Sequence, residues 1–319
     1  MQISKTQILK TKSELQSWSD AERRAGRRVA LVPTMGALHR GHIALVALAR
    51  RYAESVVVSI FVNPTQFNDR RDFEGYPRTL DSDLAACRGA GVDVVFQPSA
   101  AEMYPEGAST WVDVDGLTEP LCGANRPGHF RGVSTVVSKL LIAARPDVAV
   151  FGEKDYQQLA VIRRMTTDLG FGIRIVGGET VREPDGLALS SRNVRLGTTA
   201  RRQALCIVES LDLAERMLAG GEHDTAILVE AVRKTLARAT QARIDYAELR
   251  DPDTLAAVTG RIEGPVLLAI ALQFEPDPDG QGSAVRLIDN RVLGRRQAAG
   301  PTASCPPERK SERREEFPR

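Results

Sequence analysis

The sequence predicts an α/β fold in which a doubly wound parallel sheet is followed by a smaller α+β domain. Two observations lead to this prediction. Up to Val181, short runs of β-branched residues alternate with helical stretches, and beyond it two long helical stretches precede three strands. Apolar strands separated by helices are typical of a parallel sheet covered on both faces. We therefore expect a Rossmann-like domain over residues 1–182 and a C-terminal α+β lid domain over residues 183–293.

The first domain is expected to begin with a helix over residues 3–25. Ile8, Leu15 and Trp18 would form its apolar face, and Ser13 would cap it. Strands and helices then alternate, joined by right-handed crossovers. The expected strands lie at 29–32, 55–62, 92–96, 148–151 and 173–176, and the expected helices at 41–53, 77–90, 131–145 and 155–169.

Ligands of such a sheet bind at the carboxyl ends of its strands. The turn at 33–42 and the loops at 63–76 and 152–155 all follow expected strands. Because these ends meet at one edge of the sheet, we expect the three segments to converge on one site.

The second domain is expected to start after a turn, Glu-Pro-Asp-Gly, at 183–186. Residues 275–282 are predicted to form an exposed hairpin loop, and residues 294–319, with mixed charge and several prolines, a disordered tail. The expected helices lie at 198–219 and 224–239, and the strands of an antiparallel sheet at 243–249, 265–274 and 284–289.

Charge gives little support for a nucleic-acid surface. The formal net charge is +2, and the last 25 residues hold seven Lys or Arg and four Glu, so the remainder sums to about −1. A nucleic-acid-binding domain usually has a strongly basic face. We therefore expect no nucleic-acid partner.

The cysteines and the apolar runs indicate a cytoplasmic protein without membrane contact. Four cysteines, at positions 87, 122, 206 and 305, form no Cys-x-x-Cys pair, as expected of free thiols in a reducing compartment. The N-terminus has no apolar signal core. The longest apolar run, 266–272, is far shorter than the ~20 residues that span a bilayer.

A turn rich in glycine and histidine runs from Pro33 to His42, between an expected strand and an expected helix. Gly36 and Gly41 allow the backbone to approach a ligand closely, and free N–H groups at a helix start attract anions. His39 and His42 are three residues apart, so both rings lie on one helical face and can donate to phosphate oxygens. Histidines that only cap or pack, or that bind zinc with an unidentified third ligand, are the alternatives.

The type of nucleotide chemistry follows from what this turn contains. It lacks both G-x-x-x-x-G-K-[ST] and G-x-G-x-x-G, which argues against transfer of a γ-phosphoryl group. Histidines in place of a P-loop lysine suit attack at an α-phosphate, where donors neutralise developing charge. His42 is expected to donate to this charge, with or without transfer of a proton.

Two other segments carry groups suited to phosphate. Lys154 follows an expected buried strand and Gly152, and precedes Asp155, the expected cap of the next helix. Its ammonium is a point charge that can follow phosphates as they reorganise. The segment at 190–192, Ser-Ser-Arg, adds hydroxyls and a guanidinium fork for bidentate contacts. A solvated lysine and a solvated arginine beside ordinary turns are the alternatives.

The turn resembles the signature of the pantothenate synthetase family, within the nucleotidyltransferases that carry His-x-Gly-His. The resemblance extends through further blocks, in order, over about residues 1–293. The blocks are Ser59-Ile60-Phe61-Val62-Asn63-Pro64, Tyr76-Pro77-Arg78-Thr79, Arg126-Pro127-Gly128-His129-Phe130-Arg131-Gly132-Val133, Phe151-Gly152-Glu153-Lys154-Asp155, Leu189-Ser190-Ser191-Arg192-Asn193 and Arg286-Leu287-Ile288-Asp289-Asn290.

This resemblance implies an ATP-dependent ligase. It would condense (R)-pantoate with β-alanine through a pantoyl adenylate, giving pantothenate, AMP and diphosphate, with Mg²⁺ and in a cytoplasmic homodimer. The implied catalytic residues are His42, His39 and Lys154, and those around pantoate are Gln66 and Gln158, with Asn63 and Tyr76 as neighbours. The residues implied around ATP are Met35, Gly36, His39, Gly41, His42, Gly152, Lys154, Asp155, Val181, Leu189, Ser190, Ser191 and Arg192, with Val181 near adenine.

Two positions depart from the family pattern. Thr65 stands where methionine is common, which would trim an apolar wall near the acid, and Cys122 stands where glutamate is usual, which removes a charge near 126–131. Asp83 is considered as an indirect Mg²⁺ contact without being assigned. The alternatives are another small-molecule nucleotidyltransferase, which would keep the nucleotide on its product, and an RNA-binding synthetase remnant, which would need a basic face.

Overall fold

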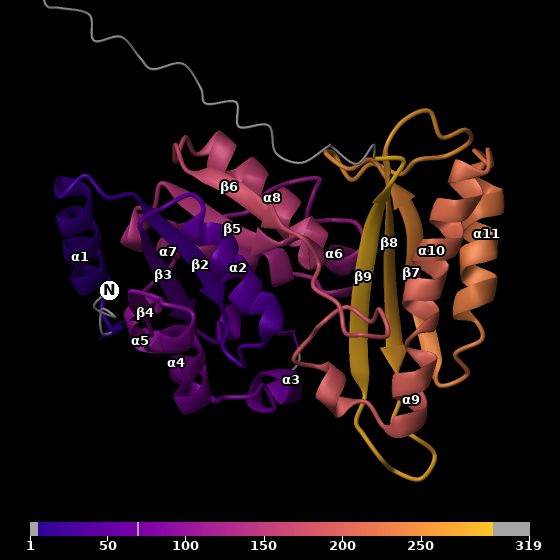
Figure 1. The fold of residues 1–319 in the computed structure, drawn as a ribbon, viewed down its shortest axis with the longest axis horizontal. Helices are drawn as coiled ribbons and strands as arrows, with labels where there is room; N and C mark the ends of the chain where they lie inside the picture. Colours follow the sequence, from indigo (N-terminus) through magenta and orange to yellow (C-terminus); the bar gives the residue numbers. More distant parts are fainter. Residues whose placement is uncertain (1–5, 69, 296–319) are drawn as a thin grey trace, which may run out of the picture.

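The larger part of the chain folds around a six-stranded parallel sheet. The computed structural model describes residues 6–68 and 70–295 (Figure 1). The strands are β1 (Gln7–Leu9), β2 (Val29–Thr34), β3 (Ser55–Ile60), β4 (Val94–Phe96), β5 (Val148–Gly152) and β6 (Arg174–Gly178). Their order is β1-β4-β3-β2-β5-β6, so the winding direction reverses between β2 and β5. Ligands bind at the carboxyl ends of strands at such a reversal.

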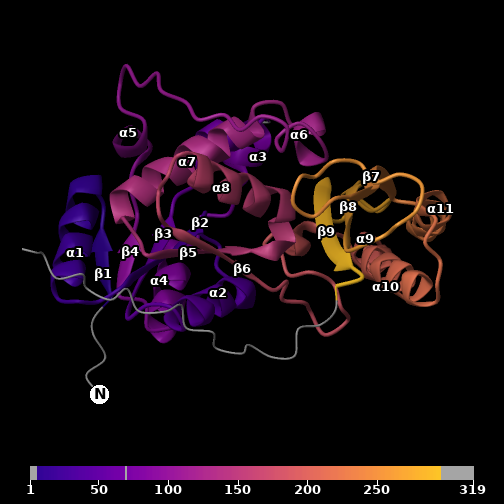
Figure 2. The same ribbon diagram turned by 90° about the horizontal axis from the view of Figure 1, so that it is seen from above.

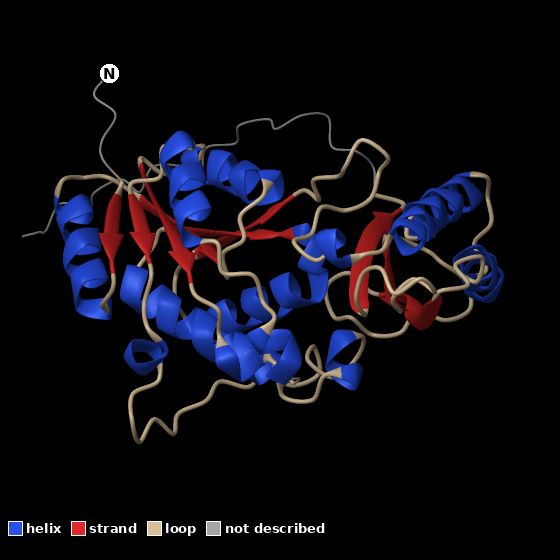
Figure 3. Cartoon of the chain, turned by 90° about the horizontal axis from the view of Figure 1, so that it is seen from below, coloured by secondary structure: helices blue, strands red, loops and turns tan. Residues whose placement is uncertain are grey.

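Helices cover both faces of this sheet (Figure 3). One face packs against α2 (Arg40–Arg50) and α4 (Leu80–Gly89), and the other against α1 (Lys12–Arg24), α7 (His129–Ala144) and α8 (Tyr156–Asp168). Strand β2 serves both cores. Val29 and Leu31 belong to the core on the α7 side, whereas Ala30 and Val32 belong to the core on the α2 side. The predicted doubly wound parallel sheet is therefore confirmed.

Short helical segments connect these elements. They are η1 (Pro64–Gln66), α3 (Arg70–Glu74), α5 (Ala100–Met103), α6 (Cys122–Asn125), η2 (Glu153–Asp155) and η3 (Asn193–Arg195). The segment η2 follows β5 directly, and η1 follows β3 after residues 61–63, so both lie at the edge of the sheet where ligands bind.

The second sheet is antiparallel, as the sequence predicts. Its strands are β7 (Ala242–Arg250), β8 (Val266–Phe274) and β9 (Val285–Leu293), and its helices are α9 (Thr198–Gln203), α10 (Cys206–Ala219) and α11 (Thr225–Leu236). Helices α10 and α11 cover one face, while the other face turns toward the larger domain (Figure 1 and Figure 2). On that face Tyr246, Leu267 and Ala269 join the core that also contains α7 and α8.

The start of the chain differs from the prediction. Residues 7–9 form β1, which pairs with β4, so the expected helix over 3–25 begins only at Lys12. Its cap is Thr11, because the Thr11 hydroxyl accepts from Glu14 N at 3.2 Å and the Glu14 carboxylate accepts from Thr11 N at 2.9 Å. Ser13 is therefore wrong as the cap, since this reciprocal pair already occupies the helix start.

The structure corrects one prediction in the C-terminal domain and adds a detail to another. The helix expected over 198–219 is interrupted at 204–205, where Ile207 N bonds to Ala204 O at 3.1 Å, a tighter turn than the α-helix allows. The loop at 275–282 joins β8 to β9 and is exposed as predicted except at Asp277, which is buried and caps α9 by accepting from Thr199 N at 2.8 Å and Ala200 N at 3.0 Å. The predicted tail lies outside the described residues.

Gly132 yields a test of how α7 meets η1. A Cβ at Gly132 would lie 2.4 Å from Thr65 O and 2.8 Å from Gln66 N, so backbone would have to move. We expect Gly132→Ala to lower the free energy of unfolding by about 1–3 kcal/mol, measured in urea. Gly89→Ala is the matched control, because a Cβ there has no neighbour within 4 Å. Equal effects of the two changes would contradict this reading of the α7 contact.

Candidate active site

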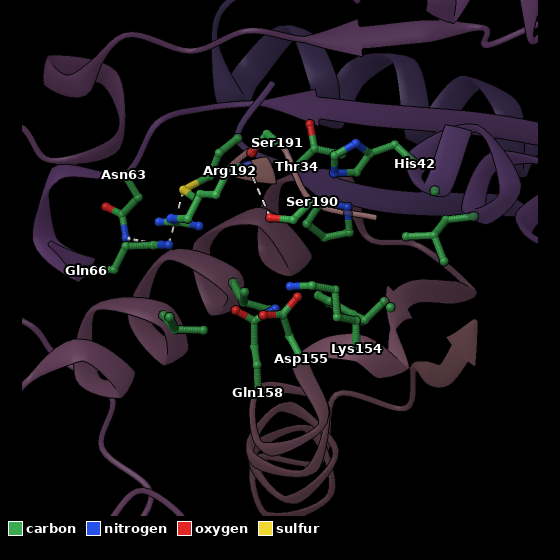
Figure 4. Close-up of a pocket in the computed structure, with 18 of the residues that line it drawn as sticks. Thr34, His42, Asn63, Gln66, Lys154, Asp155, Gln158, Ser190, Ser191 and Arg192 are labelled. Carbon is green, nitrogen blue, oxygen red and sulfur yellow. Dashed lines mark hydrogen bonds between the residues drawn. The ribbon is translucent and has the colours of Figure 1, made fainter. Parts of the chain in front are cut away.

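A cavity of about 250 Å³ lies at the carboxyl ends of β2 and β5, where the winding direction reverses (Figure 4). It brings together nearly all of the residues that the sequence predicts. These are Met35, His39, Gly41, His42, Asn63, Gln66, Tyr76, Gly152, Lys154, Asp155, Gln158, Val181, Leu189, Ser190, Ser191 and Arg192. The exception is Gly36, which shapes the turn at φ 83° without lining the cavity.

The buried carboxylate of Asp83 accepts hydrogen bonds from the turn after β2. Asp83, on α4, accepts from Ala37 N at 3.0 Å and from Leu38 N at 2.8 Å. A Cβ at Gly36 would lie 3.0 Å from the same carboxylate, so this position favours glycine for space as well as for its positive φ. Because both Asp83 oxygens already accept from the turn, they fix the backbone that leads into α2.

The two histidines cap the helix that they begin. His39 Nδ1 accepts from Gly41 N at 3.1 Å, and His42 Nδ1 accepts from His39 N at 3.2 Å. Their rings stack with centroids 4.1 Å apart. The alternative that these histidines cap the helix is therefore correct for their Nδ1 atoms. It also determines the protonation of Nε2. A neutral ring that accepts at Nδ1 carries its proton on Nε2.

Both rings are held in the neutral state. Burial, aided by the neighbouring His39, lowers the pKa of His42 to about 3. Burial, followed by the charge of Lys154, also lowers the pKa of His39. At neutral pH each ring can therefore donate a hydrogen bond from Nε2, but an imidazolium is not available at His42 to give up a proton.

Gln66, on η1, is oriented by a neighbouring amide. Asn63 Nδ2 donates to Gln66 Oε1 at 3.1 Å and to Gly132 O at 3.1 Å, while Gln66 Nε2 lies 3.2 Å from Met35 Sδ. Asn63 Oδ1 in turn accepts from Tyr104 OH at 2.9 Å. The bonding capacity of Asn63 is thus used within the protein. Gln66 spends its oxygen on Asn63 and one N–H on Met35 Sδ, which leaves one amide N–H for a ligand in the cavity.

An apolar wall stands beside these amides. It comes from one face of α7 and from the residue after β3, and consists of Val133, Val136, Val137, Leu140 and Phe61. Tyr76 is buried and packs edge-on against Phe67, with ring centroids 5.9 Å apart. The cavity therefore offers apolar surface and fixed amide donors side by side, as in sites for small organic ligands.

Lys154, Asp155 and Gln158 lie across the cavity from His42 and Arg192 (Figure 4). Asp155 stands at the cap position of α8, but its side chain makes no capping hydrogen bond. The expected capping role of Asp155 is therefore wrong, because the backbone of η2 leads directly into α8. Its carboxylate faces the cavity instead.

The segment at 189–192 brings an arginine from the C-terminal side. Arg192 pairs with Asp72 of α3 at 3.3 Å, and Arg195 pairs with the other oxygen of Asp72 at 3.3 Å. Ser190 Oγ accepts from Arg192 N at 3.2 Å. One carboxylate of the larger domain thus holds two guanidinium groups that follow β6.

Two residues that line the cavity, Arg126 and His129, have no role assigned from the sequence. His129 Nδ1 lies 2.7 Å from Gln66 O, and Arg126 Nη1 lies 3.2 Å from His129 Nε2. Because arginine only donates, His129 accepts at Nε2 and donates from Nδ1. Burial, followed by the charge of Arg126, lowers the pKa of His129 to about 4. The block at 126–133 pointed to these two residues in the sequence. Their contact with η1 could not be predicted, because only the fold brings the two segments together.

Comparison with known proteins places this geometry in a family. A family model described as pantoate-beta-alanine ligase matches residues 7–292. The chain belongs to this family. It is 53% identical to a pantothenate synthetase of Solidesulfovibrio magneticus over 90% of this chain and 98% of that protein. It is 49% identical to that of Geobacter sulfurreducens over 91% and 99%.

Solved structures of the pantoate-beta-alanine ligase family share the fold. A pantothenate synthetase from Thermus thermophilus matches with a TM-score of 0.82 and 43% identity, over 90% of this chain and 99% of that one. A pantoate-beta-alanine ligase from Francisella tularensis, complexed with beta-gamma ATP and beta-alanine, matches with a TM-score of 0.71 and 33% identity, over 90% and 97%.

Neither of the two departures from the common pattern of the pantoate-beta-alanine ligase family lines this cavity. Thr65 Oγ1 bonds to Asn63 Oδ1 at 3.0 Å and lies 3.1 Å from Tyr104 OH, and Thr65 does not line the cavity. The predicted trimming of an apolar wall stays a prediction. Cys122 is buried, with its Sγ 3.2 Å from Tyr246 OH and 3.4 Å from Arg286 Nη1.

The described residues also bear on the cysteines, on metal ligands and on membrane-spanning helices. Cys87, Cys122 and Cys206 are free thiols, and Cys305 lies outside the described residues. Within 6–68 and 70–295, no group of three or more His, Cys, Asp and Glu is arranged to hold a metal ion. In the same part of the chain, every helix falls short of the length and apolar character that a membrane span requires.

The neutral, buried His42 predicts a loss of stability in acid. Because its pKa is about 3, against about 6.5 when unfolded, only the unfolded chain binds this proton between those values. The free energy of unfolding then falls as pH falls through this window, by about 2 kcal/mol for this group between pH 7 and pH 5. We expect His42→Gln to escape that part of the loss, measured by urea unfolding at both pH values.

Gly89→Ala, which changes no titratable group and places a Cβ with no neighbour within 4 Å, is the control for this measurement. It should keep the pH dependence of the unchanged chain. An unchanged pH dependence in His42→Gln would show that His42 is not held neutral in the folded state.

Proposed function

We propose that this chain condenses (R)-pantoate with β-alanine, using ATP and releasing AMP and diphosphate. The observation that supports this most directly is the cavity itself. Fixed amide donors and an apolar wall lie on one side, while neutral histidines at a helix start, a lysine and an arginine lie around the rest. A branched hydroxy acid fits the first side and a triphosphate fits the second.

In the first step the pantoate carboxylate attacks the α-phosphorus of ATP. A bond forms between a carboxylate oxygen and phosphorus, and the bond to the departing diphosphate breaks, which leaves pantoyl adenylate. His42 donates from Nε2 to the charge that develops on the α-phosphate oxygens, and His39 donates beside it. Holding both reactants in line is worth roughly 7–11 kcal/mol of the barrier.

Lys154 and the segment at 190–192 hold the phosphates in this proposal. Lys154 lies across the cavity from His42, so the two approach a bound triphosphate from opposite sides. Arg192 exchanges its contact with Asp72 for the diphosphate, and Ser190 and Ser191 add hydroxyl donors. Gly152, Asp155 and the backbone of Val181 hold the ribose and adenine, with Met35, Gly41 and Leu189 completing the nucleotide surface.

Pantoate lies between Gln66 and Gln158 in this proposal. The Gln66 amide presents its remaining N–H because Asn63 occupies its oxygen and Met35 Sδ its other N–H, which suits a substrate rich in oxygen acceptors. The α7 side chains receive the two methyl groups of the acid. Tyr76 lines the cavity beside Phe67. In the second step the neutral amine of β-alanine bonds to the acyl carbon, the bond from that carbon to the AMP oxygen breaks, and the amine loses a proton to solvent.

Mg²⁺, a homodimer and a cytoplasmic location complete the proposal. Mg²⁺ would enter with the triphosphate and compensate its charge, keeping most of its other ligands as water or phosphate. Asp83 is not assigned to it, because its oxygens accept from Ala37 N and Leu38 N.

The overall reaction is tested by omitting each substrate in turn. We expect AMP and diphosphate release with ATP, pantoate and β-alanine, and a product whose mass is that of pantothenate. With β-alanine omitted, we expect a single turnover to pantoyl adenylate. A product that keeps the nucleotide in the full mixture would instead indicate another nucleotidyltransferase and contradict the proposal.

Substitutions at the phosphate groups test the assigned roles. We expect His42→Ala and Lys154→Ala each to lower the rate of diphosphate release by roughly 10²–10³-fold, because each removes a donor to the developing charge. The rate is measured with ATP and pantoate alone, under single-turnover conditions.

The matched controls are His223→Ala and Lys234→Ala, both in the C-terminal domain and outside the cavity. They should keep the rate of the unchanged chain. Thermal unfolding of all four variants separates a lost donor from a lost fold. A folded His42→Ala variant with normal diphosphate release would remove His42 from the mechanism.

A further inference from the structure

Asn290 lies on β9 of the C-terminal domain but bonds to the turn that carries Lys154. Its Nδ2 donates to Glu153 O at 3.0 Å and to Lys154 O at 2.8 Å. Strand β9 is an edge strand of the small sheet and lies next to the larger domain (Figure 1 and Figure 2). The contact therefore crosses from one domain to the other at the cavity.

The orientation of the Asn290 amide is dictated by its partners. Both are carbonyl oxygens, so the amide must present its nitrogen, and each of its two N–H bonds has an acceptor. The η2 turn has no side-chain cap of its own at Gly152, and Asp155 does not cap the following helix. Asn290 thus supplies the side-chain bonds that η2 lacks locally.

The strand that carries Asn290 is itself anchored. The neighbouring Asp289 is buried and forms a two-point pair with Arg182, at 2.6 Å and 3.1 Å. Arg182 also donates to Gly186 O at 3.0 Å, so this pair ties β9 to the segment that leaves the larger domain. A buried, bidentate carboxylate pair holds geometry firmly. Asn290 is therefore held on a rigid support beside η2.

We propose that Asn290 is a positioning residue that fixes the backbone of Lys154 so that its ammonium reaches the triphosphate. This inference rests on the proposed role of Lys154. A lysine side chain has four rotatable bonds, so the position of its Cα decides where its charge can reach. A displacement of about 1 Å at such a group costs up to roughly 100-fold in rate. The C-terminal domain thereby completes the phosphate site through backbone contacts.

The test uses two substitutions at Asn290 in the full chain. Asn290→Ala removes the donors and the volume, whereas Asn290→Asp keeps the volume and removes the donors. We expect both to lower kcat/KM for ATP in diphosphate release by roughly 10- to 100-fold. The control is Arg291→Ala on the same strand, whose side chain pairs with Asp212 and Glu215 within the C-terminal domain. It should leave kcat/KM for ATP unchanged.

A double substitution separates positioning from a general loss of structure. If Asn290 acts through Lys154, adding Asn290→Ala to Lys154→Ala lowers the rate no further than Lys154→Ala alone. Additive losses would overturn the inference, as would normal kinetics in a folded Asn290→Asp variant. Normal kinetics in Lys154→Ala would instead overturn the proposed role of Lys154. Thermal unfolding identifies any variant that fails to fold, and Asn290→Asp carries the test if Asn290→Ala does not fold.

Discussion

The contact between the Asp83 carboxylate and the amides of Ala37 and Leu38 sets the geometry from which the site is built. Ala37 has a positive φ of 50°, a conformation that a residue other than glycine adopts only when its surroundings hold it there. The buried carboxylate supplies that hold and directs the backbone into α2. The His39 and His42 rings can then close the helix start, so their positions follow from a contact with a helix about 40 residues further along the chain.

Three side chains around the cavity share one property, which is that a key acceptor atom is already used inside the protein. The Nδ1 atoms of His39 and His42 accept from backbone, and Gln66 Oε1 accepts from Asn63. Their N–H donors remain for a ligand, beside the cations of Lys154 and Arg192 and the carboxylate of Asp155. A cavity of this kind suits two anionic substrates held together, since each would otherwise repel the other. The preference of the cavity for anionic ligands therefore comes from the direction of its hydrogen bonds more than from its shape.

Much of the fold and of the cavity could be predicted from the sequence. The features that could not be predicted depend on contacts between residues far apart in the chain. Alternating apolar runs predicted the parallel sheet, and the turn at 33–42 predicted the helix start with its two histidines. Strand β1 was missed because three residues carry too little pattern and gain their order by pairing with β4. The same holds for Asp83 and His129. Their residue types were plain, but their partners lie in segments that only the fold brings close.

The pairing of Asp72 with Arg192 and Arg195 gives the chain an internal competitor for its own substrate. Under the proposed assignment, a triphosphate must displace this carboxylate before Arg192 can bind it, so nucleotide affinity is lower than the final contacts alone would give. The same exchange runs in reverse when diphosphate departs, because the carboxylate takes over the guanidinium as the product leaves. Tight binding of the leaving group is thereby avoided, and the cavity is emptied for β-alanine to attack.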